Sequence, residues 1–87
     1  MTRNALLLSV FAALAPLAAL ALPQVGDIVG TNPADATAAL EKAGCKVQDF
    51  EAEGGKIEAK CTDGEGKGWE VYIDPKTGAV AEIKDND

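Results

Sequence analysis

The sequence predicts an α+β domain in which one N-terminal helix packs on a small antiparallel sheet of three to four strands. Three observations lead to this fold class. Helix-start and helix-stop residues bracket the stretch from Pro33 to Ala43, and the period of the apolar residues changes to two after Gly44. Two turn sequences then join the strand-like runs into two hairpins.

The first 21 residues are typical of a secretory signal peptide. Arg3 precedes an 18-residue apolar run that ends near the small-x-small sequence Ala19-Leu20-Ala21. The alternative is a membrane anchor, because a run of this length is just long enough to span a bilayer. Pro16 interrupts the run, much of it is alanine, and no basic cluster follows. We therefore expect cleavage after Ala21 and a periplasmic or secreted protein that is not held in the membrane.

The segment after the expected cleavage site is small and acidic. It carries seven lysines against 14 acidic residues, a net charge of −7. Nucleic acids and anionic membranes are bound through a surplus of Lys and Arg, so neither is an expected partner. We divide the segment into a flexible lead-in (22–32), a folded domain (33–84) and an acidic tail (85–87).

Two cysteines are expected to crosslink this small domain. A core of this size stabilises a fold only weakly, and small exported domains commonly contain a disulfide. Cys45 and Cys61 are 16 positions apart, and closing a loop of that size contributes about 3 kcal/mol. The alternative is a redox or zinc-binding pair, but the chain has no His and no second cysteine pair. We expect a structural disulfide and no metal or other cofactor.

The helix is predicted mainly from its ends. Asn32 is a suitable N-cap, Pro33 suits the first helical position, and the Asp35 carboxylate can reach back to the cap. Gly44 is a typical C-terminal stop. Between them an apolar stripe recurs at helical spacing: Ala36, Leu40 and Ala43. The lead-in before the helix has two glycines, one proline and no clear period.

Four strands are predicted in the runs "CKVQDFEAE", "KIEAKCTD", "GWEVYID" and "AVAEIK". The alternation places one apolar set on the face that the helix covers: Ile57, Ala59, Cys61, Trp69, Val71 and Ile73. The opposite set is expected to face water: Lys56, Glu58, Lys60, Glu70 and Tyr72.

The first hairpin has two alternative registers. Val47 and Phe50 lie on opposite phases, so the strand needs a bulge, an early end or an exposed Phe. A tight turn at Gly54-Gly55 places Gln48 opposite Cys61. Placing Cys45 opposite Cys61 instead predicts a longer, looser hairpin with Phe50 near its tip, and this is the register that we expect.

The second hairpin turns at the sequence "DPKTG". Pro75 presets φ for the first central position, the Asp74 carboxylate can accept from the amides that follow, and Gly78 supplies a left-handed residue after Thr77. We interpret these four residues as a turn and not as a ligand site. A four-residue loop sets Ile73 opposite Val80 and needs a bulge in the last strand, whereas a tighter loop sets Ile73 opposite Ala79. We favour the four-residue loop.

The 12 residues from Asp63 to Asp74 have some features of a calcium-binding loop. The segment begins and ends with a carboxylate and has Gly at its sixth place. However, Lys67 occupies a position that should supply an oxygen ligand, and the second half is a predicted strand. We interpret the glycine-rich part as a flexible link between two strands.

No catalytic site is predicted. After signal cleavage the chain has neither His nor Ser, and both cysteines are expected to be oxidised, so the usual nucleophile and base pairs cannot be assembled. The candidate residues for contact with a protein partner are the aromatics Tyr72 and Phe50. For Tyr72, the alternative is a cross-strand pair that only stabilises the sheet.

A helix ending in "ALEKAG", a hairpin and then "WEVYIDPKTGAVAEI" resemble the PepSY domain of peptidase propeptides and bacterial envelope proteins. The resemblance runs from about Pro33 to Lys84. It implies a helix on an antiparallel sheet, export to the periplasm or cell surface, no catalytic residues, and the binding or inhibition of another protein. Many similar sequences have an aromatic residue where this chain has Cys45, so the disulfide replaces a core aromatic.

We therefore expect a small exported PepSY-like binding module, a monomer or weak dimer that acts through the face or an edge of its sheet. Its expected role is regulatory or inhibitory towards a peptidase or another periplasmic protein. One alternative is an acidic cation-binding protein that uses Asp63 and Glu65 or the tail 85–87. The other is a purely structural envelope protein.

Overall fold

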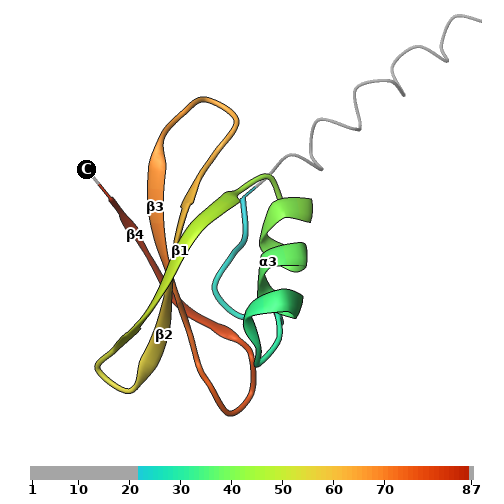
Figure 1. Ribbon diagram of the computed structural model, residues 1–87, viewed down its shortest axis with the longest axis vertical. Helices are drawn as coiled ribbons and strands as arrows, with labels where there is room; N and C mark the ends of the chain where they lie inside the picture. Colours follow the sequence, from blue (N-terminus) through green and yellow to red (C-terminus); the bar gives the residue numbers. More distant parts are fainter. Residues whose placement is uncertain (1–21, 87) are drawn as a thin grey trace, which may run out of the picture.

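The computed structural model describes residues 22–86 as one helix followed by a four-stranded antiparallel sheet. The helix is α3 (Pro33–Lys42), and the strands are β1 (Lys46–Glu53), β2 (Lys56–Thr62), β3 (Gly68–Ile73) and β4 (Val80–Asp85). The strand order is β1-β2-β3-β4, with α3 on one face of the sheet (Figure 1). The predicted fold class is confirmed. The predicted signal peptide, 1–21, lies outside the described residues.

The described part of the chain, 22–86, has no helix with both the length and the apolar character needed to cross a membrane. Helix α3 itself is short, and its ends are fixed as predicted. The Asn32 side chain accepts a hydrogen bond from the Asp35 amide and donates one to the Asp35 carboxylate, both at 2.9 Å. Gly44, at φ +94°, follows the C-cap residue Ala43. Only Ala36 and Leu40 of the helix are buried.

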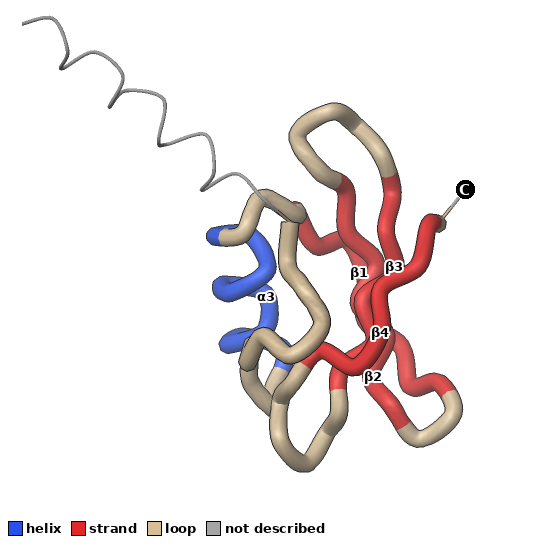
Figure 2. The backbone as a smooth tube through the Cα atoms, turned by 180° about the vertical axis from the view of Figure 1, so that it is seen from behind, coloured by secondary structure: helices blue, strands red, loops and turns tan. Residues whose placement is uncertain are grey.

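The core lies between the sheet on one side and the helix with the lead-in on the other (Figure 2). Its buried residues come from the lead-in, α3, the loop after it and the last three strands: Val29, Ala36, Leu40, Cys45, Ala59, Cys61, Val71, Ile73 and Val80. Half-buried Phe50, Ile57, Trp69 and Ile83 extend it at its margin. Because most of these side chains are small or medium-sized, the helix lies close to the sheet and the core is thin.

The lead-in makes defined contacts with the second hairpin. The Gly26 amide donates to the Val80 carbonyl at 2.9 Å, and the Val29 amide donates to the Gly78 carbonyl at 2.8 Å. Val29 and Pro23 are buried, and Leu22 packs against the core. In Figures 1 and 2 this segment runs between α3 and the strands. The stretch without a clear sequence period thus covers the part of the apolar face that α3 does not reach.

The first hairpin does not have the register that we expected. Its turn is the tight Gly54-Gly55 turn, with Glu53 opposite Lys56 and Phe50 opposite Ala59 in mid-strand. A bulge between Val47 and Asp49 then shifts the pairing so that Val47 lies opposite Cys61. The disulfide therefore forms although Val47, and not Cys45, lies opposite Cys61, with the Cα atoms of the two cysteines 5.3 Å apart. The longer, looser hairpin with Phe50 near its tip is therefore wrong.

The second hairpin has the register that we favoured. Ile73 lies opposite Val80, and Tyr72 lies opposite Glu82, so one residue of β4 bulges between them. The bulge keeps both Val80 and Ile83 on the side of the core, although they are an odd number of residues apart.

Candidate functional site

The turn that joins β3 to β4 is held by its own residues. The Asp74 carboxylate accepts hydrogen bonds from the amides of Lys76 at 2.7 Å and Thr77 at 3.3 Å. These two bonds, the Lys76 amide first, lower the pKa of Asp74. The Thr77 hydroxyl accepts from the Ala79 amide at 3.1 Å. Asp74 and Thr77 therefore both have backbone tasks, as a turn requires.

The link between β2 and β3 is organised by one carboxylate. Asp63 accepts from the amides of Glu65 and Lys67 at 2.8 and 2.9 Å through Oδ1, and from the Trp69 indole at 3.0 Å through Oδ2. The indole bond is the main cause of the lowered pKa of Asp63. Both oxygens are thus engaged in shaping the loop, which argues against the segment Asp63 to Asp74 as a calcium loop.

The two cysteines form the predicted disulfide. Cys45 follows the helix and Cys61 lies in β2, with their Cα atoms 5.3 Å apart and both residues buried. The bond joins the C-terminal end of α3 to the centre of the sheet, so it fixes the helix on its apolar face.

A surface hollow of about 430 Å³ lies beside the end of the helix, between it and the β2–β3 link. Its lining includes Glu41, Lys46, Thr62 and Asp63, a mixture of both charge signs. The Asp63 carboxylate in this lining is already bonded to the amides of Glu65 and Lys67 and to the Trp69 indole. The hollow offers polar contacts of both charge signs.

The face of the sheet that α3 leaves uncovered carries a transverse row of three glutamates and one tyrosine, which we call the acidic row. One residue from each strand lies directly opposite the next: Glu51, Glu58, Tyr72 and Glu82. Lysines flank the row. Lys60 Nζ lies 3.3 Å from a Glu51 carboxylate oxygen, and Lys84 Nζ lies 3.9 Å from one of Glu82. Like charges placed opposite one another repel, so a positive charge beside the row reduces this repulsion.

Glu58 is the residue that the sequence analysis misjudged. The alternation placed it correctly on the open face, but only 4% of its surface is exposed to solvent. It lies in β2 directly opposite Glu51 on β1 and Tyr72 on β3. Burial, followed by the charge of Glu70, raises the pKa of Glu58. The sequence feature that could have indicated this burial is the aromatic Tyr72 among charged residues. However, the pairing of Tyr72 with Glu58 can be known only from the register of the strands.

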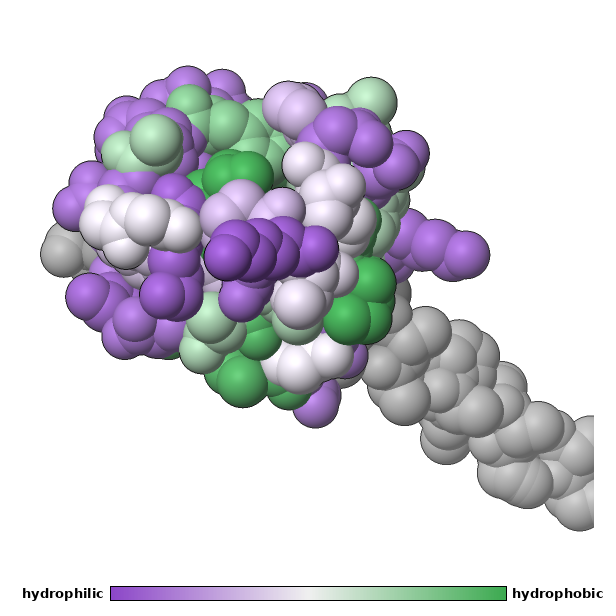
Figure 3. Space-filling model, turned by 90° about the horizontal axis from the view of Figure 1, so that it is seen from below, coloured by the Kyte–Doolittle hydropathy of each residue, from purple (hydrophilic) through white to green (hydrophobic). Residues whose placement is uncertain are grey.

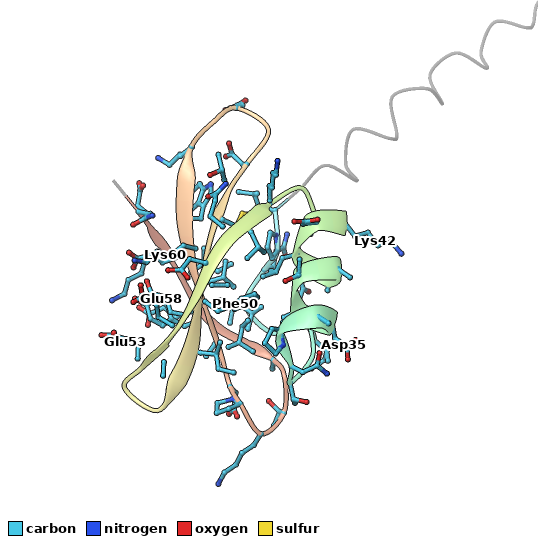
Figure 4. The ribbon with its side chains drawn as sticks, viewed as in Figure 1. Asp35, Lys42, Phe50, Glu53, Glu58 and Lys60 are labelled. Carbon is cyan, nitrogen blue, oxygen red and sulfur yellow. A yellow bond between two sulfur atoms is a disulfide. The ribbon has the colours of Figure 1, made fainter. Side chains whose placement is uncertain are left out.

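The two aromatic candidates for partner contact lie on opposite faces of the sheet. Tyr72 is half-buried on the open face, and its hydroxyl donates to Glu70 at 2.9 Å, which raises the pKa of Tyr72 to about 12. Lys84 Nζ lies 5.3 Å from the centre of its ring. These contacts fit the sheet-stabilising role. Phe50 points toward the helix in Figure 4 and packs at the margin of the core. Partner contact by either residue stays a prediction.

The two edge strands differ in how well they are protected. On β1, the bulge, three acidic side chains and a hydrogen bond from the Phe50 amide to the Asp49 carboxylate make the edge a poor template for another strand. Within β4, the lead-in hydrogen-bonds to Val80, and its other bonds in this region go to Gly78 in the turn before the strand. Among the described residues, nothing pairs with the outer side of 81–85.

The family model described as "Peptidase propeptide and YPEB domain", PepSY_2, matches residues 5–84. The chain belongs to the PepSY family. The resemblance seen from Pro33 to Lys84 thus extends over nearly the whole sequence. Neither a curated protein nor a solved structure matches the chain.

PepSY domains are typically non-catalytic. The disulfide and the PepSY domain are both consistent with an extracytoplasmic protein. Two surfaces of the described residues are open to a partner: the uncovered face of the sheet and the outer edge of β4.

Proposed function

We propose that this PepSY protein is an extracytoplasmic binding module that pairs with an extended segment of a partner protein along the outer edge of β4. The observation that supports the proposal is the unpaired outer side of 81–85. An uncovered strand edge binds an extended chain through backbone hydrogen bonds, and neighbouring side chains add specificity.

Two apolar side chains lie beside this edge. Val25 and Ile28 are 65% and 68% exposed, and they are the large hydrophobic residues most exposed in the described chain. They belong to the lead-in, which is hydrogen-bonded to the start of β4. A strand added to 81–85 would therefore continue the line of the lead-in and reach these side chains. In Figure 3 the hydrophobic patches are small and lie apart, which fits a site of backbone pairing with few apolar anchors.

We propose a peptidase as the partner class. The matching family is described as a peptidase propeptide domain, and peptidase clefts hold extended chains. Strand β4 is itself an extended chain that is held in a folded domain, so it can pair with the strand that lines a peptidase cleft. Val25 and Ile28 beside it are the side chains that the cleft would accept. The module then acts by occupying the cleft and slows the peptidase without being a substrate.

The test compares two substitutions at Asp85. The Asn86 amide donates to the Gly68 carbonyl on β3, so by alternation the Asp85 amide points outward. Asp85→Pro removes that outward donor, whereas Asp85→Ala removes the same ion pair with Lys67 and keeps the donor. Peptidases from the same compartment are assayed with a stoichiometric amount of each protein.

We expect the natural protein and Asp85→Ala to slow at least one peptidase, and Asp85→Pro to slow it much less. A double variant, Val25→Asp with Ile28→Asp, should also lose the effect, because both positions are exposed and tolerate a polar side chain in the fold. If no peptidase is slowed by the natural protein, or if Asp85→Pro is as effective as Asp85→Ala, the proposal is wrong.

A further inference from the structure

Three carboxylates on the open face converge at one point. Glu51 and Glu53 from β1 and Glu58 from β2 each bring a carboxylate oxygen within 4.8 Å of the other two. Glu51 and Glu58 are direct cross-strand partners, and Glu53 lies two residues along the same face. Figure 4 shows Glu53 and Glu58 on the side of the sheet away from α3, with Lys60 beside them. The tight hairpin turn thus gathers three negative charges.

Glu58 separates this group from an ordinary acidic surface patch. It is 4% exposed, and among residues 22–86 no hydrogen bond or ion pair reaches its carboxylate. Three other acidic residues of the open face have such partners: Glu51 bonds to Lys60, Glu70 accepts from Tyr72, and Glu82 lies near Lys84. Glu53 has no such partner among residues 22–86 either, but it is exposed to solvent. Burying a carboxylate without a partner is costly unless a cation or proton compensates it.

We propose that Glu51, Glu53 and Glu58 form a binding site for a hard divalent cation of the calcium class. All three donors are carboxylate oxygens, which hard cations prefer. Zinc and the softer metals favour His and Cys, but the chain has no His and both cysteines are in the disulfide. This site differs from the loop Asp63–Glu65 and from the tail 85–87.

The coordination habits of the two hard cations favour calcium over magnesium at such a site. Ca²⁺ accepts carboxylates in flexible geometry at about 2.3–2.6 Å, whereas Mg²⁺ demands a near-ideal octahedron at about 2.0–2.1 Å and keeps several waters. The three oxygens lie within 4.8 Å of one another, so one Ca²⁺ ion can reach all of them. Three carboxylates leave room for several waters, and such a site resembles extracellular calcium modules, whose Kd values are about 10⁻⁴–10⁻³ M.

Lys60 competes with the cation in this arrangement. Its ammonium lies 3.3 Å from Glu51 Oε2, and the Glu51 bond is the main cause of the raised pKa of Lys60. Lys60 also carries the nearby positive charge that lowers the pKa of Glu58, against burial and the charges of Glu70, Glu51 and Glu53. A bound cation would take over this role, so removal of the ammonium should favour binding.

The test is a calcium titration of the segment 22–87, which contains the helix, the sheet and the disulfide, followed by amide NMR shifts at constant ionic strength. We expect saturable shifts confined to the β1–β2 hairpin, with a millimolar or lower midpoint. Glu58→Gln keeps the size of the side chain and should weaken binding about tenfold or more. Glu82→Gln, in the same acidic row on β4, is the matched control and should leave the midpoint unchanged. Lys60→Met should lower the calcium concentration at the midpoint, because it removes the competing ammonium.

The affinity should also depend on pH. Protons compete with calcium for the three carboxylates, so binding should weaken as the pH falls into the acidic range. The groups facing Glu58 are Glu51 and Glu53 on β1, Lys60 on β2, and Glu70 and Tyr72 on β3.

Three results would overturn the proposal of a calcium site at these three glutamates. The first is the absence of saturable shifts, and the second is equal binding by Glu58→Gln and the natural protein. The third is a set of shifts centred on 63–67 or 85–87. Because Glu51, Glu53 and Glu58 lie away from the outer edge of β4, none of these results bears on the peptidase proposal.

Discussion

At the scale of single residues, Gly78 is under two constraints at once. Its φ of +77° lies in the left-handed region, which favours glycine. A Cβ atom built on it would also lie 2.8 Å from the Gly30 carbonyl carbon and 2.9 Å from Gly30 Cα. The Gly78 carbonyl accepts hydrogen bonds from the amides of Val29 and Gly30. The residue therefore serves both the hairpin turn and the docking of the lead-in.

We predict that Gly78→Ala lowers the free energy of unfolding by about 2 kcal/mol or more, because strain at positive φ and a backbone clash add together. Gly78→Val should lose at least as much. Gly66→Ala is the matched control, since Gly66 has φ +85° and open space around its Cα, and it should lose only about 1 kcal/mol. Denaturant-induced unfolding measures the free energy of unfolding of the Gly78 and Gly66 variants. Equal losses would mean that the close approach to Gly30 contributes nothing.

The residue scale also shows where sequence reasoning ends. The backbone tasks of Asp74, Thr77 and Gly78 follow from local chemistry, and the structure has them as expected. The burial of Glu58 could not be predicted, because it depends on which side chains stand on the two neighbouring strands. Alternation assigns a residue to a face, but exposure on that face depends on the register.

At the scale of elements, one hairpin followed from the sequence and the other did not. The loop from Pro75 to Gly78 has enough signals to fix its length, and the bulge in β4 followed from that length. In the first hairpin the Gly54-Gly55 turn places Gln48 opposite Cys61, whereas direct pairing of the cysteines places Cys45 there, three residues away. We resolved the conflict by lengthening the turn, whereas the chain keeps the tight turn and has a bulge at Gln48. A one-residue bulge cannot be located from the sequence of a strand whose residues alternate in polarity.

The disulfide is the link between two elements whose other contacts are few. Helix α3 has only two buried side chains, and Cys45 lies three residues after its last residue, Lys42. We predict that replacing Cys45 and Cys61 by Ala lowers the free energy of unfolding by about 3 kcal/mol or more, from loop entropy plus lost packing. Thermal unfolding followed by circular dichroism measures the loss.

The natural protein under reducing agent separates the two contributions, since it keeps both side chains and loses only the crosslink. It should unfold at a temperature between those of the oxidised protein and the double-alanine variant. A reduced protein as stable as the oxidised one would show that the crosslink itself adds nothing.

At the scale of the whole molecule, the fold is a small domain with a thin core, one crosslink and a charged open face. Such a domain is suited to an oxidising compartment, where its disulfide persists. The disulfide and the PepSY family are both consistent with an extracytoplasmic protein, and export through a signal peptide at residues 1–21 stays a prediction from the sequence.

We predict that the exported protein begins at Leu22. The apolar run has the length and the small-x-small exit of a cleaved signal, and cleavage there leaves the described domain intact. Intact mass and N-terminal sequencing of the protein from the extracytoplasmic fraction measure this. Retention of Arg3 and the apolar run would instead support a membrane anchor.

The packing of Leu22 and Pro23 bears on when the predicted cleavage after Ala21 would take place. Pro23 is buried and Leu22 packs against the core, directly beside the expected cleavage site. A signal peptidase needs the residues around the bond as an accessible, extended chain. We therefore expect cleavage to precede the final packing of these two residues, and a precursor that folds early should be cleaved more slowly.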